Sequence, residues 1–177
     1  MEEKTKMKKY LLILTLLLLS NPVKADSLAD TNYAGFGVNA MSVYTKAKLF
    51  EGMEEKKNRK ELKKYLKIDP VEIPWCAAFV NSVLEELGFK STKSLAAMTY
   101  AKYNKPTKTP TKGDIVVIKR NGGSGAHVGF FHGFKNGGKT VSILGGNQSN
   151  KVNIKDVPVS IVISYRKIEE KVYPSYP

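Results

Sequence analysis

The chain of 177 residues has one cysteine, Cys76, and two histidines, His127 and His132. Cys76 follows Pro74-Trp75 and opens an apolar stretch with helical spacing, which places the thiol in the first turn of a predicted helix. The free N–H groups and the dipole at a helix N-terminus stabilise a thiolate, and they also bind the oxyanion of a tetrahedral intermediate. This position suits a nucleophilic cysteine, but by itself it leaves open the commoner alternative, a small buried side chain.

A thiol nucleophile needs a base. The two histidines lie five positions apart on a predicted strand, so their side chains point to opposite faces and only one can serve the site. His127 begins the strand next to the glycine-rich turn Asn121–Gly125, where a side chain can face a cleft. Histidines on strands are more often structural than catalytic, and that alternative holds for either one alone. His127 is the expected base.

A polar side chain must orient the imidazole. The segment Gly145-Gly146-Asn147-Gln148 follows the next predicted strand. If the turn Asn136-Gly137-Gly138 joins the two strands as a hairpin, Asn147 lies directly opposite His127, provided that no bulge intervenes. Asn147 is the expected third catalytic residue, Gln148 could accept the same imidazole N–H, and the two glycines allow close backbone approach to a substrate. The alternative is a turn asparagine that caps its own loop.

Helical patterns come first along the chain. They cover Met41–Phe50, Lys57–Leu66, Cys76–Leu87 (with Gly88 just past its end) and Ser94–Ala101. Strand patterns follow at Asp114–Ile118, His127–Gly133, Thr140–Leu144 and Val159–Tyr165. Helices followed by strands that tight turns connect predict an α+β fold with a small antiparallel sheet.

The N-terminus reads as a signal peptide. Lysines between Lys4 and Lys9 precede the apolar run Leu11–Leu19, and Val23-Lys24-Ala25 offers a small-residue cleavage pattern. The apolar run is too short to cross a hydrocarbon core of about 30 Å, so an anchor or interfacial helix is the weaker alternative. We therefore expect cleavage after Ala25 and a secreted or periplasmic protein. An unpaired cysteine in an exported protein is an intermolecular bridge, a buried bystander or a reactive thiol.

The formal net charge is +13, and residues 1–25 hold five lysines and two glutamates, so the remainder carries +10. Such a surface favours polyanions, namely nucleic acid, anionic lipid or the anionic polymers of a bacterial envelope, and export makes nucleic acid the weakest of the three. Nucleic acid is not an expected partner, because the lysines are scattered and no nucleic-acid-binding motif is present. A solvated basic surface without a specific partner is the alternative.

Four motifs stand in one order along the chain: Ile73-Pro74-Trp75-Cys76-Ala77-Ala78-Phe79-Val80-Asn81, Gly113-Asp114-Ile115-Val116-Val117, His127-Val128-Gly129-Phe130 and Leu144-Gly145-Gly146-Asn147-Gln148-Ser149-Asn150. Together they resemble the CHAP and NlpC-type superfamily of papain-like cysteine peptidases and amidases. The resemblance is strongest to small phage-associated and bacterial members with a Trp-Cys-Ala-Ala-Phe-Val signature. It covers roughly residues 41–168.

The resemblance implies a papain-like core in which the helix bearing Cys76 packs on the sheet bearing His127. It implies hydrolysis of a peptidoglycan amide through a thioester, either within the stem peptide or between N-acetylmuramic acid and L-alanine, without a metal or cofactor. Two positions depart from many relatives: Trp75 replaces an Asp, and Asn147 replaces a His or another polar residue. The expected catalytic residues are Cys76, His127 and Asn147, and the expected substrate-binding residues are Trp75, Gly145, Gly146 and Gln148.

The expected organisation is a signal peptide (1–25), an irregular leader (26–40), a hydrolase domain (41–168) and a C-terminal tail (169–177), in a monomer. Two other functions fit the same residues. One is a catalytically silent module that binds the cell wall. The other is the same chemistry in an antibacterial effector or phage lysin, for which a small inhibitor or immunity protein would be the partner.

Overall fold

The computed structural model of the chain describes residues 39–120 and 125–169. The predicted signal peptide, most of the predicted leader, most of the turn Asn121–Gly125 and nearly all of the predicted tail lie outside these residues. The described residues fall within one compact unit. None of the helices among them has the length and apolar content needed to cross a bilayer.

The helices come first, as predicted. They are α2 (Ala40–Lys48), α3 (Arg59–Leu66), α4 (Cys76–Glu86) and the 3-10 helix η2 (Ala97–Lys102). Asn39 caps α2, because its side-chain oxygen accepts the N–H groups of Met41 and Ser42 at 3.0 and 3.2 Å. The fourth predicted helix is real but forms a 3-10 helix that starts three residues late.

Helix α4 ends where Gly88 predicts. The N–H of Phe89 donates to the carbonyl of Leu84 at 2.8 Å, and the N–H of Gly88 donates to the carbonyl of Glu85 at 3.0 Å. Gly88 itself has a φ of +71°, the left-handed conformation that this C-terminal motif requires. The C-terminal boundary of the helix that begins with Cys76 is thus set by one glycine.

Five antiparallel strands form one sheet in the order β4-β3-β2-β1-β5. Their bounds are β1 (Ile115–Lys119), β2 (Ala126–Lys135), β3 (Thr140–Gly145), β4 (Asn153–Pro158) and β5 (Val162–Arg166). The sequence prediction missed β4, an edge strand whose exposed Lys155 and Asp156 blur the apolar alternation. It also began the last strand too early, because Val159–Ile161 form the short 3-10 helix η4.

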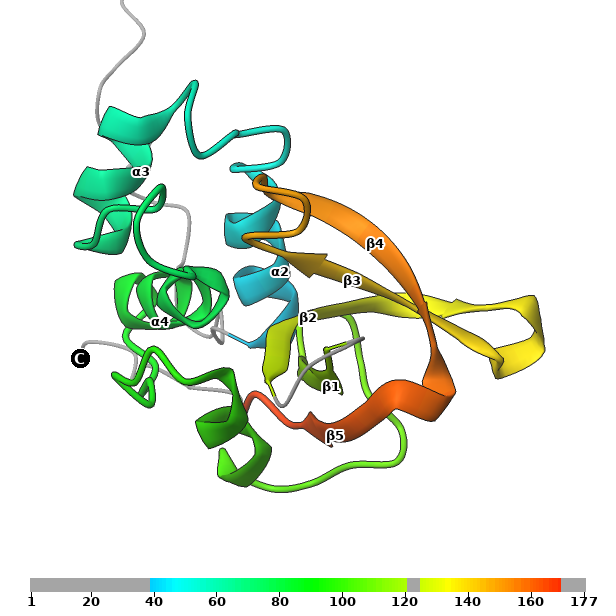
Figure 1. Cartoon of the computed structure of the whole chain (residues 1–177). Helices are drawn as coiled ribbons and strands as arrows, with labels where there is room; N and C mark the ends of the chain where they lie inside the picture. The colour runs from blue at the N-terminus through cyan, green and yellow to red at the C-terminus, as the bar shows by residue number, and fades with distance from the viewer. Residues whose placement is uncertain (1–38, 121–124, 170–177) are drawn as a thin grey trace, which may run out of the picture. The chain divides into compact units, whose positions relative to one another are not determined.

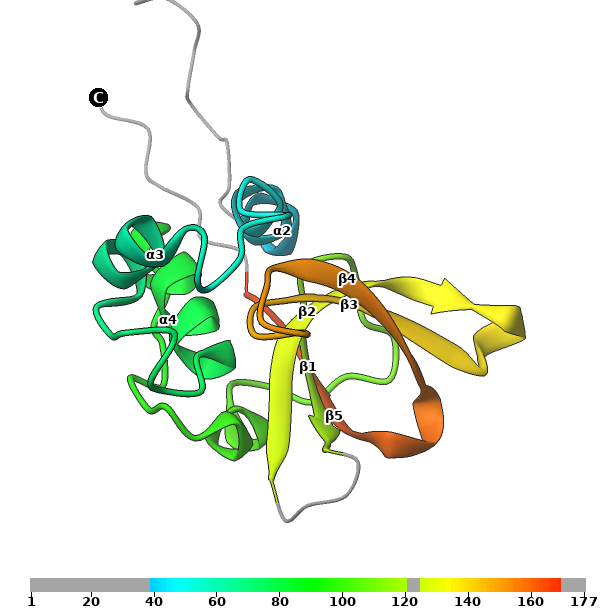
Figure 2. The ribbon, with the colours of Figure 1, turned by 45° about the horizontal axis from the view of Figure 1, so that its top comes forward.

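The three α-helices lie to one side of the sheet, as Figures 1 and 2 show. Val128 and Phe130 of β2 belong to the main cluster with α4, and the rings of Phe79 and Phe130 meet edge-on with centroids 6.3 Å apart. A smaller apolar cluster contains Ile118 and Ile143. The antiparallel sheet with helices packed against it confirms the predicted α+β, papain-like fold.

The β2–β3 hairpin has two registers. Phe130 pairs with Leu144 and Phe131 with Ile143, as a turn centred on Gly137 predicts. The pairing then shifts by one residue between Phe131 and Gly133, so His132 occupies a β-bulge. The predicted register therefore holds only for the half of the hairpin that leads toward His127.

The Gly113-Asp114 motif has a structural role. Gly113 has a φ of +96°, and a Cβ there would lie 1.7 Å from the carbonyl oxygen of Ala40, so no other residue fits. The fully buried carboxylate of Asp114 accepts the N–H groups of Thr111 at 2.7 Å and Ile168 at 2.9 Å. This motif joins the start of α2 and the end of β5 to the edge of the central strands.

Candidate active site

Cys76 is the first residue of α4, and its side chain is only 4% exposed. No side chain caps the start of this helix, so the N–H groups of its first turn have no side-chain partner in the described structure. These N–H groups can receive a developing oxyanion next to the thiol. Helix α4 contacts β2, the strand that carries His127, and Figure 2 shows the two side by side.

Trp75 supports the start of α4 from inside the core. Its side chain is fully buried, and its indole N–H donates to the Glu55 carboxylate at 3.1 Å. A Cβ at Gly146 would lie 2.4 Å from the indole Cζ3 atom, so the Gly146 backbone packs directly on the ring. This corrects the expectation that Trp75 binds substrate, because a fully buried ring has no surface to offer.

His127 is 6% exposed, and among the described residues its imidazole hydrogen-bonds Gln148, whose Oε1 lies 3.2 Å from Nε2. The Gln148 amide nitrogen is surrounded by acceptors: the carbonyls of Ile143, Gly145 and Asn153 and the side-chain oxygen of Asn153, at 2.6–3.4 Å. This arrangement fixes the amide with its oxygen toward His127. The proton of a neutral imidazole therefore sits on Nε2, which leaves Nδ1 as the basic nitrogen.

The residue that hydrogen-bonds the imidazole is thus Gln148, which the sequence offered as the alternative, and not Asn147. The ladder of β3 ends at Gly145, which pairs with Asn153 of β4, so the hairpin does not extend to an Asn147–His127 pair. Asn147 has a φ of +58° and lies in the turn that follows. That turn brings the side chain of Gln148 within hydrogen-bond distance of the His127 imidazole, while Asn147 lines the neighbouring cavity.

The surroundings of His127 disfavour its charged form. Burial, together with the positive charges of Arg120 and Lys155, lowers the pKa of His127 to about 4, although the hydrogen bond to Gln148 acts in the opposite direction. At neutral pH the imidazole is therefore uncharged. A neutral imidazole is the form that can accept a proton from a thiol.

Gly145 and Gly146 link the thiol side of the site to the imidazole side. A Cβ at Gly145 would lie 3.2 Å from the imidazole Nε2, just as one at Gly146 would strike the ring of Trp75. Val128 belongs to the same main apolar cluster as Cys76, whereas Ile118, the strand partner of His127, belongs to the smaller cluster, so the imidazole and the Val128 side chain lie on opposite faces of the sheet. Within the described residues, no hydrogen bond joins the thiol to the imidazole. The two groups flank the diglycine segment.

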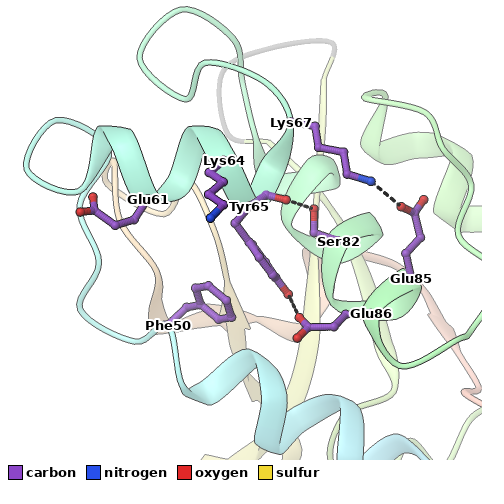
Figure 3. Close-up of a pocket in the computed structure, with 8 residues that line it drawn as sticks. All are labelled: Phe50, Glu61, Lys64, Tyr65, Lys67, Ser82, Glu85 and Glu86. Carbon is purple, nitrogen blue, oxygen red and sulfur yellow. Dashed lines mark hydrogen bonds and ion pairs between the residues drawn. The ribbon is translucent and has the colours of Figure 1, made fainter.

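A cavity of about 340 Å³ lies beside His127. Besides Asn147 and Gln148, its lining includes Lys119 and Arg120 at the end of β1 and Lys155 of β4. A second cavity, of about 630 Å³, lies between α3 and α4 (Figure 3) and contains none of the expected site residues. There Glu85 pairs with Lys67 and Glu86 accepts the hydroxyl of Tyr65, so these charges are already partnered.

Sequence reasoning missed Glu55 and the three cations of the smaller cavity. Glu55 is 9% exposed, yet it stands in a run of charged residues that reads as a solvated surface. Lys119, Arg120 and Lys155 look like any of the scattered basic residues. No local pattern distinguishes them, because only the pairing of the strands brings the end of β1 and a residue of β4 to one cavity beside His127.

Residues 68–147 match the family model of the CHAP domain. The match includes Cys76, the Gly113-Asp114 pair and His127, and it ends one residue before Gln148. A search of curated proteins found no match. CHAP domains are typically hydrolases of peptidoglycan that depend on a cysteine and a histidine. The family match thus confirms the resemblance to the CHAP and NlpC-type superfamily, with a CHAP domain detected at residues 68–147.

Proposed function

We propose that the protein is an exported cysteine hydrolase that cleaves one amide bond of bacterial peptidoglycan. The bond lies within the stem peptide or between N-acetylmuramic acid and L-alanine. Cys76 is the nucleophile, His127 the base, and Gln148 the residue that orients the imidazole. One observation supports this assignment most: the Gln148 amide is held so that Nε2 of a buried histidine must carry the proton, and this histidine lies on the strand that packs against the helix of the single thiol.

In the proposed reaction, Nδ1 of His127 takes the proton of the Cys76 thiol as Sγ attacks the amide carbonyl carbon. N–H groups in the first turn of α4 bind the oxyanion. Nδ1–H then protonates the leaving nitrogen, the C–N bond breaks, and a thioester remains. Water, deprotonated by His127, attacks the thioester and releases the carboxylic acid and the thiol. Catalytic hydrogen bonds often tighten only in the substrate complex, and we expect Nδ1 and Sγ to approach each other there.

Substrate contacts are proposed for the residues around the imidazole. Asn147 lines the cavity beside His127, so its side chain is placed to contact substrate rather than to orient the base. The lack of a side chain at Gly145 keeps the space next to the imidazole Nε2 free, whereas the Gly146 backbone packs on the Trp75 ring. Wall polymer is the proposed partner, and the positive net charge supports attraction to anionic envelope polymers.

Digestion of purified peptidoglycan tests the activity. Mass spectrometry of the released fragments should show one new amine and one new carboxylic acid, which together identify the bond. Cys76→Ala should release nothing, while its circular dichroism and its free energy of unfolding stay within about 1 kcal/mol of the wild type. A Cys76→Ala variant that still hydrolyses the wall would contradict the mechanism. Wall binding without any release by the wild type would instead indicate a silent module.

Export has its own test. Peptidoglycan lies outside the cytoplasm, and residues 1–25 have the pattern of a cleaved signal peptide. N-terminal sequencing of protein from the culture supernatant or the periplasm should begin at Asp26. A soluble intracellular pool that retains Met1 would argue against export.

A further inference from the structure

The cavity beside His127 gathers three cations without an anionic partner. Lys119, Arg120 and Lys155 all line it, and within the described residues none of them forms an ion pair. The one acidic residue in the lining, Asp156, is engaged elsewhere: its carboxylate binds Lys135 at 2.8 Å and accepts the Ser142 hydroxyl at 2.5 Å. The cavity therefore has uncompensated positive charge.

Strand pairing places these charges next to the base. Lys155 of β4 pairs with Ile143 of β3, and His127 of β2 pairs with Ile118 of β1. Ile118 and Ile143 belong to the same small cluster, so the four side chains share one face of the sheet. Arg120 and Lys155 are close enough to His127 to act on its titration. A partly enclosed pocket that is lined by positive charges attracts an anion.

We infer that this cavity binds a carboxylate carried by the amino acid on the amine side of the scissile bond. The inference rests on the proposed function, because in that reaction His127 protonates the leaving nitrogen. The leaving residue must therefore lie against the imidazole, and the cavity that His127 lines contains Lys155 and Arg120. Both side chains can donate charge-assisted hydrogen bonds to a carboxylate. The substrate class is thus an acidic peptide whose free carboxylate follows the cleaved bond.

Binding of this carboxylate also helps the reaction. His127 becomes positively charged during catalysis, and Arg120 and Lys155 oppose that charge in the free enzyme. A substrate carboxylate between the cations and the imidazole offsets their repulsion. The enzyme should therefore discriminate between a free carboxylate and a carboxamide at this position, although both have the same shape.

A pair of muropeptides tests the subsite. One has free carboxylates throughout its stem peptide, and in the other each is a carboxamide. Wild type should prefer the acidic form by roughly tenfold in kcat/KM, mainly through KM. Lys155→Gln and Arg120→Gln should each bring the ratio of the two kcat/KM values closer to one. Lys139→Gln is the control, because it removes the same charge from an exposed site on the hairpin turn and should keep the preference. A third muropeptide, amidated only on the acyl side of the cut, should behave like the acidic form.

An unchanged preference in both variants and in the double variant would overturn the subsite while leaving the hydrolysis intact. Calorimetry with Cys76→Ala separates the two proposals further. If wild type cleaves neither muropeptide, the proposed function fails. Tighter binding of the acidic form to Cys76→Ala, lost in Cys76→Ala/Lys155→Gln, would still support the subsite, and equal binding of both forms would refute it.

Discussion

The two nitrogens of the His127 ring have different surroundings, and this difference assigns their roles. Nε2 faces the Gln148 oxygen, whereas Nδ1 makes no hydrogen bond among the described residues. The glutamine is held in turn by Asn153, whose own side-chain amide donates back to the Gln148 carbonyl at 3.0 Å. The edge strand β4 thereby fixes the tautomer of a base that lies two strands away.

Removing the Gln148 side chain should therefore lower kcat by roughly a hundredfold and leave KM nearly unchanged, since misplacement of the imidazole affects the chemical step. Gln148→Glu keeps the acceptor but adds a negative charge, which raises the pKa of His127. The acidic limb of the kcat/KM profile should then move to higher pH. Asn147→Gly is the matched control: it removes a neighbouring side chain, tolerates the φ of +58°, and should retain most of the turnover. Equal losses in Gln148→Ala and Asn147→Gly would contradict the assignment.

The two histidines give a second contrast. His127→Ala should lower the rate by several orders of magnitude and slow the alkylation of Cys76 by iodoacetamide at neutral pH, because the thiol loses its base. His132 instead bonds the hydroxyl of Tyr44 at 2.6 Å in the bulge of β2. His132→Ala should cost about 1 kcal/mol of stability and leave turnover intact. Loss of turnover in His132→Ala alone would show that the wrong base has been assigned.

At the scale of elements, the diglycine segment is what allows α4 and the end of β3 to meet. Gly146 has no positive φ, so its constraint is purely steric: a Cβ would lie 2.4 Å from the Trp75 ring and 2.9 Å from the Phe79 Cβ atom. Gly146→Ala should destabilise the protein by about 1–3 kcal/mol in urea unfolding and reduce activity, because it pushes on the residue before Cys76. Gly133→Ala is the control, since a Cβ there meets nothing within 4 Å. Equal stability of the two variants would contradict this packing.

Most elements could be predicted from sequence because their signals are local. Gly88 ends α4, the apolar run at Ile115–Ile118 predicts β1, and the turn at Gly137 predicts the β2–β3 hairpin. What failed depends on tertiary contacts. The exposed edge strand β4 forms only through its pairing with β3. The bulge at His132 coincides with a hydrogen bond from this histidine to Tyr44 of α2. Gln148 and Asn147 are equally polar neighbours, and only the turn after β3 decides which of them reaches the imidazole.

For the whole molecule, the burial of an uncharged histidine makes stability depend on pH. The pKa of His127 is about 4 in the folded protein, against an ordinary value of 6.5. As pH falls, the unfolded chain binds the proton first. The stability that depends on an uncharged His127 is therefore fully present above pH 6.5 and is lost progressively between pH 6.5 and pH 4. It amounts to about 3 kcal/mol at most. The free energy of unfolding, measured in urea from pH 7.5 to 4.5, should decrease accordingly.

His127→Gln should flatten this dependence but not abolish it. His132 also has a lowered pKa, caused by partial burial and by Lys112 and Lys48, and it contributes in the same direction. Asp69 acts at lower pH, because Arg59 and Lys63 hold the pKa of its carboxyl well below the ordinary value. A slope in His127→Gln as steep as that of the wild type would mean that the imidazole is solvated in the folded protein.

The bulge at His132 has a consequence for how the hairpin can vary. It divides the β2–β3 ladder into an inner frame, which includes the pair Phe130–Leu144, and an outer frame, which includes Phe134–Val141. The outer frame projects away from the helices and ends in the exposed turn at Gly137 (Figure 2). Insertions or deletions at that tip alter only the outer frame, so the imidazole keeps its neighbours. The tip is therefore the natural position for length variation among related chains, and for inserting an epitope or a fluorophore without disturbing hydrolysis.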